Sequence, residues 1–374
     1  MERPVAPDRL SAIRAPFVAF GGVWSDAAVL QPLSLLLDLA GEAMRARLFT
    51  VQGEGAAELC LRPDFTIPIA SVHIESGAAE GRYLYEGKAF RTAPRGSGRP
   101  AEFLQMGAEV YGQADDKIGQ DVEIAALAWT ASQAGGRSDL GLVLGDVALF
   151  DAFLAALDLP QALRTRLVGA YASGRSLQQE LSRARSGPAP RAGERLPELL
   201  GSLPEGEATG VLEELWKLAG ISPVGGRSPA EIAHRLCARA EQAWAGRLSP
   251  AEADLITRYL EIIAPPREAF DRIESLAYEA KVEFDVQLQP WVRRLRGLAA
   301  AGVPEWAMVF STGFMRAFGY YDGMLFEVRS LELGYDRPVA AGGRYDSLPA
   351  RLGARDRVGA VGCTVRPGRA VAEA

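Results

Sequence analysis

Cysteine and histidine are scarce in this sequence. Its 374 residues include three cysteines, Cys60, Cys237 and Cys363, and two histidines, His73 and His234. Because these five residues are scattered along the chain and form no four-ligand zinc pattern, we expect no metal site. Three scattered thiols also favour a reducing compartment over a disulfide framework.

Long apolar runs are absent as well. No stretch of 18 apolar residues occurs, and the N-terminal sequence carries charge and proline where a signal peptide needs an apolar segment. These features predict a cytoplasmic protein that does not enter a membrane. The formal net charge of −6 gives no general attraction to nucleic acid or to anionic membranes.

Common catalytic motifs are also missing. The sequence has no GxxxxGK[ST] phosphate-binding loop and no GxSxG nucleophile elbow. The two histidines leave few candidates for acid–base catalysis. We interpret His234, inside an amphipathic helical pattern, and His73, after a predicted turn, as structural residues.

The remaining pattern indicates one sheet interrupted by helices. Apolar residues make up 48% of the chain and charged residues 24%, as is typical of a globular protein. Strand-like segments occur at 82–85, 103–111 and 140–144, with a helical pattern at 121–132. Further strand-like segments follow at 306–310, 323–328 and 358–365. We predict an α+β fold with a first core part at 1–146, a mostly helical insertion at 147–302 and a second core part at 303–374.

Two helix starts in the predicted insertion share one motif. Ser228 and Ser249 each begin the sequence Ser-Pro-Ala-Glu. The serine supplies an N-cap hydroxyl, the proline suits the first helical position, and the glutamate can reach back to form a capping box. We attribute the shared phrase to capping and not to an internal repeat.

Polar residues within strand-like segments are the candidates for a binding site. Asp64 and Thr66 would point the same way in an extended segment. Arg91 enters a loop rich in glycine, proline and arginine. Gln105 and Glu109 follow that loop and share one face of the next predicted strand. The later part of the chain contributes Arg316, Tyr320, Tyr321, Arg344 and Tyr345.

Each of these pieces also has a plainer interpretation. Asp64 and Thr66 can form a turn or a cap, Arg91 and Glu109 a cross-strand ion pair, and the tyrosines simple packing. Gly107, between Gln105 and Glu109, is expected to leave that face of the strand open. Taken together, carboxylate, amide, guanidinium and phenol groups are those that bind a small zwitterion with a polar ring.

At these residues the chain resembles the catalytic core of class II aminoacyl-tRNA synthetases, specifically histidyl-tRNA synthetase. The sequence RPDFT at 62–66 resembles the family's RPEGT, and 90–91 with 103–112 resembles motif 2. The segments 316–321 and 341–346 resemble the two histidine-specific segments. The resemblance implies an antiparallel sheet flanked by helices, with a helical insertion. It also implies a histidine pocket lined by Asp64, Thr66, Arg91, Gln105, Glu109, Arg316, Tyr320 and Tyr321, supported by Arg344 and Tyr345.

Within this implied pocket, Glu109 and Tyr321 would recognise the imidazole. Arg91 and Arg316 stand at positions that handle ATP and the activated carboxylate in the synthetases. The chain departs from that pattern elsewhere, because the acid after the motif 2 arginine is missing and motif 3 keeps only its final arginine, Arg369. Arg366 stands where a glycine would admit the nucleotide. The motif 1 region is short, and we expect no anticodon-binding domain.

This combination resembles one branch of the family, the regulatory subunits of ATP phosphoribosyltransferase. The resemblance implies a non-catalytic chain without a cofactor, which assembles with the short-form catalytic subunit for the first step of histidine biosynthesis. L-histidine would be its feedback effector, and a homodimer within a hetero-oligomer its assembly, with no tRNA and no membrane as partner. Two alternatives remain open: a truncated enzyme that forms histidyl-adenylate for an acceptor other than tRNA, and a scaffold that has lost ligand recognition.

Overall fold

The computed structural model describes residues 4–40, 42–52, 58–93, 96–112, 116–172, 177–186, 248–315, 319–355 and 358–372, with a few helical residues between 206 and 214. His234, Cys237, the Ser228 motif and Arg316 lie outside the described residues. Within the described part of the chain, no helix combines the length and the apolar character needed to cross a membrane.

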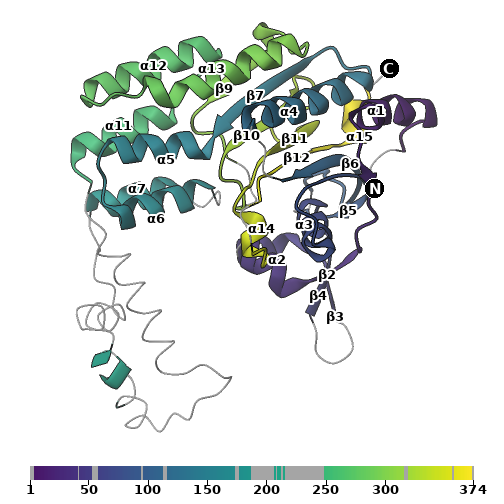
Figure 1. Ribbon diagram of the computed structural model, residues 1–374, viewed down its shortest axis with the longest axis horizontal. Coiled ribbons are helices and arrows are strands. Elements are labelled where there is room, and N and C mark those ends of the chain that lie inside the picture. The colour runs from purple at the N-terminus through teal and green to yellow at the C-terminus, as the bar shows by residue number, and fades with distance from the viewer. Residues whose placement is uncertain are drawn as a thin grey trace.

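A large mixed sheet forms the centre of the protein (Figure 1). Among the described residues it has nine strands, in the spatial order β1 (Val23–Trp24), β5 (Gly81–Phe90), β6 (Glu102–Tyr111), β12 (Ala360–Val365), β11 (Ala340–Arg344), β10 (Met324–Ser330), β7 (Leu140–Asp146), β9 (Met308–Ser311) and β8 (Ile263–Ala264). The pairs β1–β5 and β7–β9 are parallel, and the other described pairs are antiparallel. The predicted α+β class, an antiparallel sheet flanked by helices, is confirmed.

Both ends of the sequence contribute to this sheet. The late strand β12 lies between β6 and β11, and β10 pairs with the early strand β7. The strands expected at 82–85, 103–111 and 140–144 are therefore direct or near neighbours of those expected at 323–328 and 358–365. The segment 306–310 is only partly a strand, because a short 3-10 helix, η3 (Glu305–Ala307), precedes β9.

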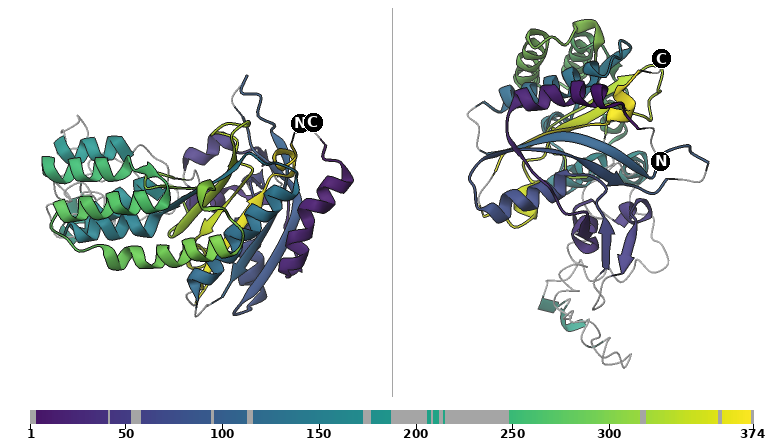
Figure 2. Two further views of the ribbon diagram at one scale, coloured as in Figure 1. Left: turned by 90° about the horizontal axis from the view of Figure 1, so that it is seen from above. Right: turned by 90° about the vertical axis from the view of Figure 1, so that its right-hand side faces the viewer.

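Helices cover both faces of the sheet (Figures 1 and 2). Helix α4 (Lys117–Ala134) packs on β10, β11 and β12, and α1 (Pro7–Phe20) and α15 (Pro367–Ala370) pack on α4. In α4 the buried residues Ile124, Ala128 and Ala131 recur at helical spacing, which gives this helix an apolar face toward the strands. Helix α3 (Thr66–Ser76) packs on β6 and against α14 (Leu348–Arg351).

A group of helices lies at the β8 end of the sheet, on the left in Figure 1. Its described members are α5 (Val147–Ala156), α6 (Gln161–Ala172), α7 (Leu177–Ser186), α11 (Pro250–Leu260), α12 (Pro266–Glu279) and α13 (Asp285–Ala300). The capping box predicted at Ser249 is confirmed, since its hydroxyl accepts from the Glu252 amide and the Glu252 carboxylate accepts from the Ser249 amide.

A smaller antiparallel sheet lies below the main one in Figure 1. It contains β2 (Leu30–Pro32), β4 (Glu58–Leu61) and β3 (Thr50–Gln52), with α2 (Leu33–Ala40) and η1 (Glu42–Arg47) alongside. The expected extended segment at 64–66 is wrong, because the chain turns after β4 and Thr66 is the first residue of α3. His73 likewise lies inside α3 and not after a turn.

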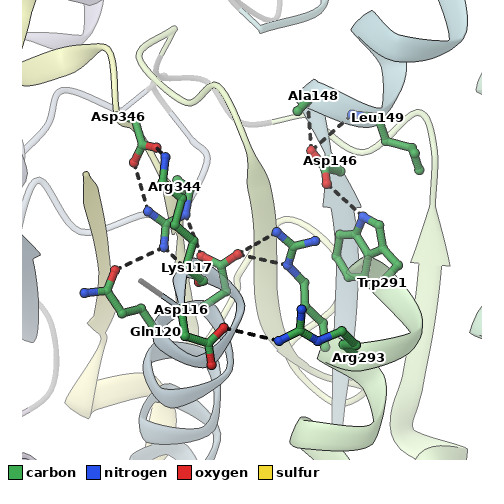
Figure 3. Close-up of polar contacts among 12 residues, drawn as sticks. Asp116, Lys117, Gln120, Asp146, Ala148, Leu149, Trp291, Arg293, Arg344 and Asp346 are labelled. Atoms are coloured by element: carbon green, nitrogen blue, oxygen red, sulfur yellow. Dashed lines mark hydrogen bonds and ion pairs between the residues drawn. The ribbon is translucent and has the colours of Figure 1, made fainter. Parts of the chain in front are cut away.

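Buried polar contacts join α13 to the core of the protein (Figure 3). Asp121 on α4 is fully buried and accepts hydrogen bonds from Arg344 Nε at 2.7 Å and from Arg294 Nε at 2.9 Å. Asp146, at the end of β7, caps α5 and also accepts a 2.7 Å hydrogen bond from Trp291 Nε1. Helix α13 is therefore attached to both α4 and β7 by partnered buried groups.

Candidate functional site

Strand alternation brings polar side chains to the face of the sheet that α3 covers. Glu109 on β6 lies opposite Tyr83 on β5 and Gly362 on β12. Two residues earlier, Gly107 lies opposite Tyr85 and Thr364. Directly opposed residues of an antiparallel pair point to the same face. These residues therefore share one surface, above which α3 presents Thr66.

Glu109 is at the centre of this surface. Its side chain is 1% exposed and accepts a 2.8 Å hydrogen bond from the Thr66 hydroxyl. The Tyr345 hydroxyl donates to the other carboxyl oxygen. The Tyr85 hydroxyl lies 3.4 Å from the first carboxyl oxygen and 3.2 Å from the Cys363 carbonyl oxygen, so its one proton is shared between these two acceptors. Side chains from α3, from β5 and from the end of β11 thus converge on one buried carboxyl group.

The environment of Glu109 changes its proton affinity. Burial disfavours the charged carboxylate and, although the hydrogen bonds from Tyr345 and Thr66 oppose the effect, raises the pKa of Glu109 to about 8. Burial also raises the pKa of Tyr345, so this phenol remains a hydrogen-bond donor at neutral pH. A cationic ring placed beside Glu109 would favour its ionised form.

Two glycines allow the strands to approach Glu109 and Tyr85. A Cβ on Gly362 would lie 1.6 Å from Glu109 Oε2, so a side chain at this position is incompatible with the observed position of the carboxyl group. A Cβ on Gly107 would lie 2.2 Å from the Tyr85 hydroxyl. The expectation that Gly107 leaves its face open is therefore wrong, because the Tyr85 ring fills the space the glycine provides.

A small cavity adjoins the Glu109 cluster. Its volume is about 10 Å³, which is room for about one water molecule. Five of the predicted site residues line it, together with Tyr85 and residues of β11 and β12; the predicted five are Asp64, Thr66, Arg91, Tyr320 and Tyr321. The structure brings these side chains together, and their role as histidine ligands remains a prediction.

Three tyrosines pack beside this cavity. The Tyr320 and Tyr321 ring centres lie 4.6 Å apart, and both rings meet Tyr345 edge-on at 5.7 and 6.0 Å. Tyr320 is 2% exposed and Tyr321 is 7% exposed. Edge-to-face packing of this kind holds aromatic rings in defined orientations. The tyrosines therefore form one wall of the site.

Arg91 follows the end of β5 and is not the cross-strand partner of Glu109. Phe90 lies opposite Glu102, so Arg91 stands near the far end of β6 from Glu109. Its Nε donates a 2.8 Å hydrogen bond to the carbonyl of Pro63. The alternative of a cross-strand ion pair is thereby overturned, and Arg91 is instead a wall residue of the small cavity.

Four other predicted residues, Gln105, Glu109, Arg344 and Tyr345, do not line the small cavity. Gln105 is 2% exposed and shares a face with Glu109, but it does not line the small cavity. Its side-chain carbonyl oxygen has no hydrogen-bond partner among the described residues. Tyr345 contacts Glu109 directly, whereas Arg344 points to the opposite face, where it bonds Asp121 and Asp346.

Sequence reasoning missed Tyr85 and the β12 residues of the cavity. Tyr85 was visible as an aromatic residue in a strand, but its place opposite Gly107 depends on the register of β5 and β6. Thr364 reaches the site because β12, more than 200 positions later in sequence, inserts beside β6. No local pattern in the sequence signals this pairing.

His73 occupies a buried position away from the cavity lining. Its ring stacks on Tyr111 with centres 4.4 Å apart, and its Nδ1 lies 3.1 Å from the Tyr83 hydroxyl. Burial lowers the pKa of His73. These contacts fit the structural role we assigned to it. Among the described residues, no group of three or more metal-ligating side chains is placed to hold an ion.

The mixed sheet and its flanking helices form a class II synthetase-like core, as comparison with known proteins shows. The family model described as Histidyl-tRNA synthetase matches residues 27–220 and 208–369. A crystal structure titled as an ATP phosphoribosyltransferase regulatory subunit/histidyl-tRNA synthetase from Bacillus halodurans C superposes with a TM-score of 0.62 at 20% identity, covering 99% of this chain and 80% of that one. Histidyl-tRNA synthetase from Nostoc sp. PCC 7120 gives 0.61 at 14% identity, covering 96% and 69%.

Two curated proteins are similar to this chain in sequence along most of its length. A Brucella anthropi protein named ATP phosphoribosyltransferase regulatory subunit is 36% identical over 342 residues, covering 90% of this chain and 89% of that protein. A Mesorhizobium japonicum protein of the same name is 36% identical over 345 residues, covering 91% and 90%. The chain belongs to the histidyl-tRNA synthetase-like family of ATP phosphoribosyltransferase regulatory subunits.

Proposed function

We propose that this chain is the regulatory subunit of an ATP phosphoribosyltransferase and that free L-histidine, bound beside Glu109, is its regulatory signal. The catalytic residues would lie on a short-form partner subunit, and this chain would form a homodimer within the hetero-oligomer, without tRNA. Family membership supports the regulatory role. The proposal that histidine is the ligand is supported by the convergence of Thr66, Tyr85 and Tyr345 on the buried carboxyl group of Glu109.

The groups around the small cavity match the chemistry of histidine. Glu109 does not line the small cavity but hydrogen-bonds Thr66 and Tyr85 of its wall, and with the phenols beside it can hydrogen-bond both nitrogens of an imidazole once those side chains move. Arg91 can bind the α-carboxylate, and the Asp64 carboxylate can accept from the α-ammonium group. Gln105 lies outside the cavity lining on the same face of β6; its buried carbonyl oxygen lacks a donor among the described residues, and such a group is commonly satisfied by a ligand or by water.

The size of the cavity gives a physical basis for regulation. A volume of about 10 Å³ cannot hold an imidazole ring, so side chains must move before histidine enters. Tyr320 and Tyr321 line the cavity and are the candidates for this movement. A ligand that binds one conformation more tightly than another shifts the equilibrium between them, with couplings of typically about 1–3 kcal/mol.

Calorimetric titration tests histidine binding directly. We expect saturable binding of L-histidine to the full chain, and at least about tenfold weaker binding to Glu109→Gln, because the amide cannot pair with an imidazolium. The matched control is Glu123→Gln on α4, which removes an exposed carboxylate paired with Arg82. No heat and no thermal shift with the wild-type chain would favour a scaffold without ligand recognition.

Assay of the complex tests the regulatory role. The chain should co-purify with a short-form ATP phosphoribosyltransferase, raise its activity and make that activity sensitive to histidine. Histidine-dependent exchange between pyrophosphate and ATP, measured on the isolated chain, separates this role from adenylate formation. Robust exchange would reject the regulatory proposal in favour of an active enzyme.

A further inference from the structure

The three tyrosines beside the small cavity are joined by hydrogen bonds as well as by ring contacts. The amide of Asp322, the residue after the tyrosine pair, donates a 3.1 Å hydrogen bond to the carbonyl of Arg344, the residue before Tyr345. The Asp322 carboxylate also accepts from two backbone amides just after Tyr345, at 3.0 and 2.6 Å. Residues 320–322 and 344–347 are therefore one packed unit, which we call the tyrosine wall.

Helix α13 is attached to the tyrosine wall by buried ion pairs. Arg344 Nε lies 2.7 Å from one carboxylate oxygen of Asp121, and Arg294 on α13 lies 2.8 Å from the other. The Asp121 side chain is fully buried, and those of Arg344 and Arg294 are 6% and 11% exposed. Opposite charges shielded from water attract each other more strongly than exposed ones. The strand end that carries Tyr345 is therefore bound firmly to α13.

Helices α6 and α11 hold the chain segment that leads to the tyrosine pair. The hydroxyl of Tyr171 on α6 is buried and lies 2.6 Å from the Thr312 carbonyl oxygen and 3.1 Å from that of Phe314, so its one proton is shared between two acceptors. A Cβ on Gly313 would lie 2.4 Å from the carbonyl oxygen of Leu260, so the backbone of this segment lies directly against the end of α11.

These three helices belong to the group at the β8 end of the sheet, which we call the helical group. Within it α13 packs on α5, α5 packs on α6, and α7 packs on both α6 and α11. The tyrosine wall and the segment before it are thus held by one set of packed helices. Separation of the wall from these helices would leave buried polar groups without partners, which is unfavourable.

We propose that histidine binding in the small cavity moves the tyrosine wall and the helical group together, so that the position of these helices depends on occupancy of the cavity. The inference rests on the proposed function, in which the wall must move before an imidazole ring can enter. Coupling between sites is carried by contiguous packed and hydrogen-bonded contacts. It is also reciprocal, so a partner that holds these helices in one position would change the affinity for histidine by the same factor.

Arg294 and Tyr171 are positioning residues in this arrangement. Neither lines the small cavity, and each acts through the groups that it holds. Arg294 acts through Asp121, and Tyr171 acts through the backbone of residues 312–314. Their substitution should therefore weaken the response of the helices to histidine more than it weakens histidine binding itself.

Amide hydrogen exchange of the full chain, with and without saturating L-histidine, tests the proposal. In the wild-type chain we expect histidine to change exchange rates in α6 and α13 by at least about fivefold, the lower end of ordinary allosteric coupling. Helix α1, at the other end of the sheet in Figure 1, should not respond. Calorimetry on the same samples measures histidine binding.

Substitutions at the two attachments give the specific readout. Arg294→Gln should remove most of the response of α13, and Arg294→Lys, which keeps the positive charge beside Asp121, should retain it. Tyr171→Phe keeps the ring that packs on Phe150 and should remove most of the response of α6. All three variants should bind histidine within about tenfold of the wild-type affinity. A merely structural role would lower stability with and without histidine and leave the difference between the two states unchanged.

The matched control is Arg258→Gln, which removes an exposed guanidinium group of α11 that pairs with Glu279 and should respond as the wild-type chain does. Histidine binding to the wild-type chain without changed exchange in α6 and α13 would overturn this inference and leave the proposed function standing. Equal responses of the wild-type chain, Arg294→Gln and Tyr171→Phe would do the same. Absence of histidine binding would contradict the proposed function and this inference with it.

Discussion

Arg344 and Tyr345 are consecutive residues at the end of β11, and their side chains reach opposite faces of the sheet. Tyr345 donates its hydroxyl hydrogen bond to Glu109 in the candidate site. Arg344 donates to Asp121 on α4, and Asp121 also pairs with Arg294 on α13. Residues 344 and 345 therefore contact both the candidate ligand site and the buried Asp121 that binds α13, and this links the site to α13 directly.

Replacement of Asp121 should destabilise the fold. Asp121→Asn removes the buried carboxylate that Arg344 and Arg294 share, although Arg344 keeps Asp346 as a second partner, and removal of one member of a buried ion pair costs about 3–5 kcal/mol. Urea unfolding measures the change. Glu268→Gln removes an exposed partner of Arg272 and should have little effect. Equal stabilities of the two variants would contradict the importance we assign to Asp121.

The hydrogen bond between Trp291 and Asp146 should contribute separately. Trp291→Phe keeps an aromatic ring against Phe310 but leaves Asp146 without the 2.7 Å donor from Nε1. Loss of a buried partner costs about 1–3 kcal/mol. The free energy of unfolding, measured with urea, should fall by this amount. An unchanged midpoint would show that Asp146 finds another donor.

A methyl group at Gly362 should disturb the site. The added Cβ of Gly362→Ala would overlap Glu109 Oε2, and overpacking in a core costs about 1–3 kcal/mol. Gly169 provides the control, because it lies inside α6 with no atom near its added Cβ, and Gly169→Ala should stabilise the helix by about 0.5–1 kcal/mol. Thermal unfolding of both variants should therefore shift in opposite directions.

Glu109 should make stability depend on pH. Burial raises its folded-state pKa from 4.5 to about 8, so the folded chain holds a proton that the unfolded chain releases between these values. Its contribution is full below about pH 4.5 and falls as pH rises to about 8, by at most about 1.4 kcal/mol per pH unit. Urea unfolding at pH 6, 7 and 8 should show this slope in the wild-type chain and lose it in Glu109→Gln. Parallel profiles would refute the shifted pKa.

The Tyr321 hydroxyl should matter for the ligand more than for the fold. Tyr321→Phe keeps the ring that packs beside Tyr345 and removes a polar atom from the cavity wall. We expect about tenfold weaker histidine binding by calorimetry, with stability changed by less than about 1.5 kcal/mol. Tyr278→Phe, at an 86% exposed position of α12, is the control. Global unfolding of Tyr321→Phe would assign this hydroxyl to structure instead.

Local patterns predicted much of the secondary structure and several site residues. The strands around 82–85, 103–111 and 140–144, the helix around 121–132 and the Ser249 capping box all occur as expected. Periodicity and capping chemistry act over a few residues, so the sequence carries them directly. The segment 64–66 was misjudged because its polar residues suit an extended strand as well as the turn before α3.

The sequence by itself determined which chemical groups are available. They are the carboxyl group of Glu109, the phenols of the site tyrosines, and the guanidinium groups of arginines in the early and late parts of the chain. Only the tertiary structure decided their arrangement. β12 lies between β6 and β11, and this places Gly362 opposite Glu109 and the Arg366 guanidinium group over the Phe103 ring. At the end of β11, the side chain of Tyr345 reaches Glu109 and that of Arg344 reaches the opposite face of the sheet. Strand order and register arise from burial of apolar faces contributed by distant segments, and a change of register by one residue would exchange the two faces.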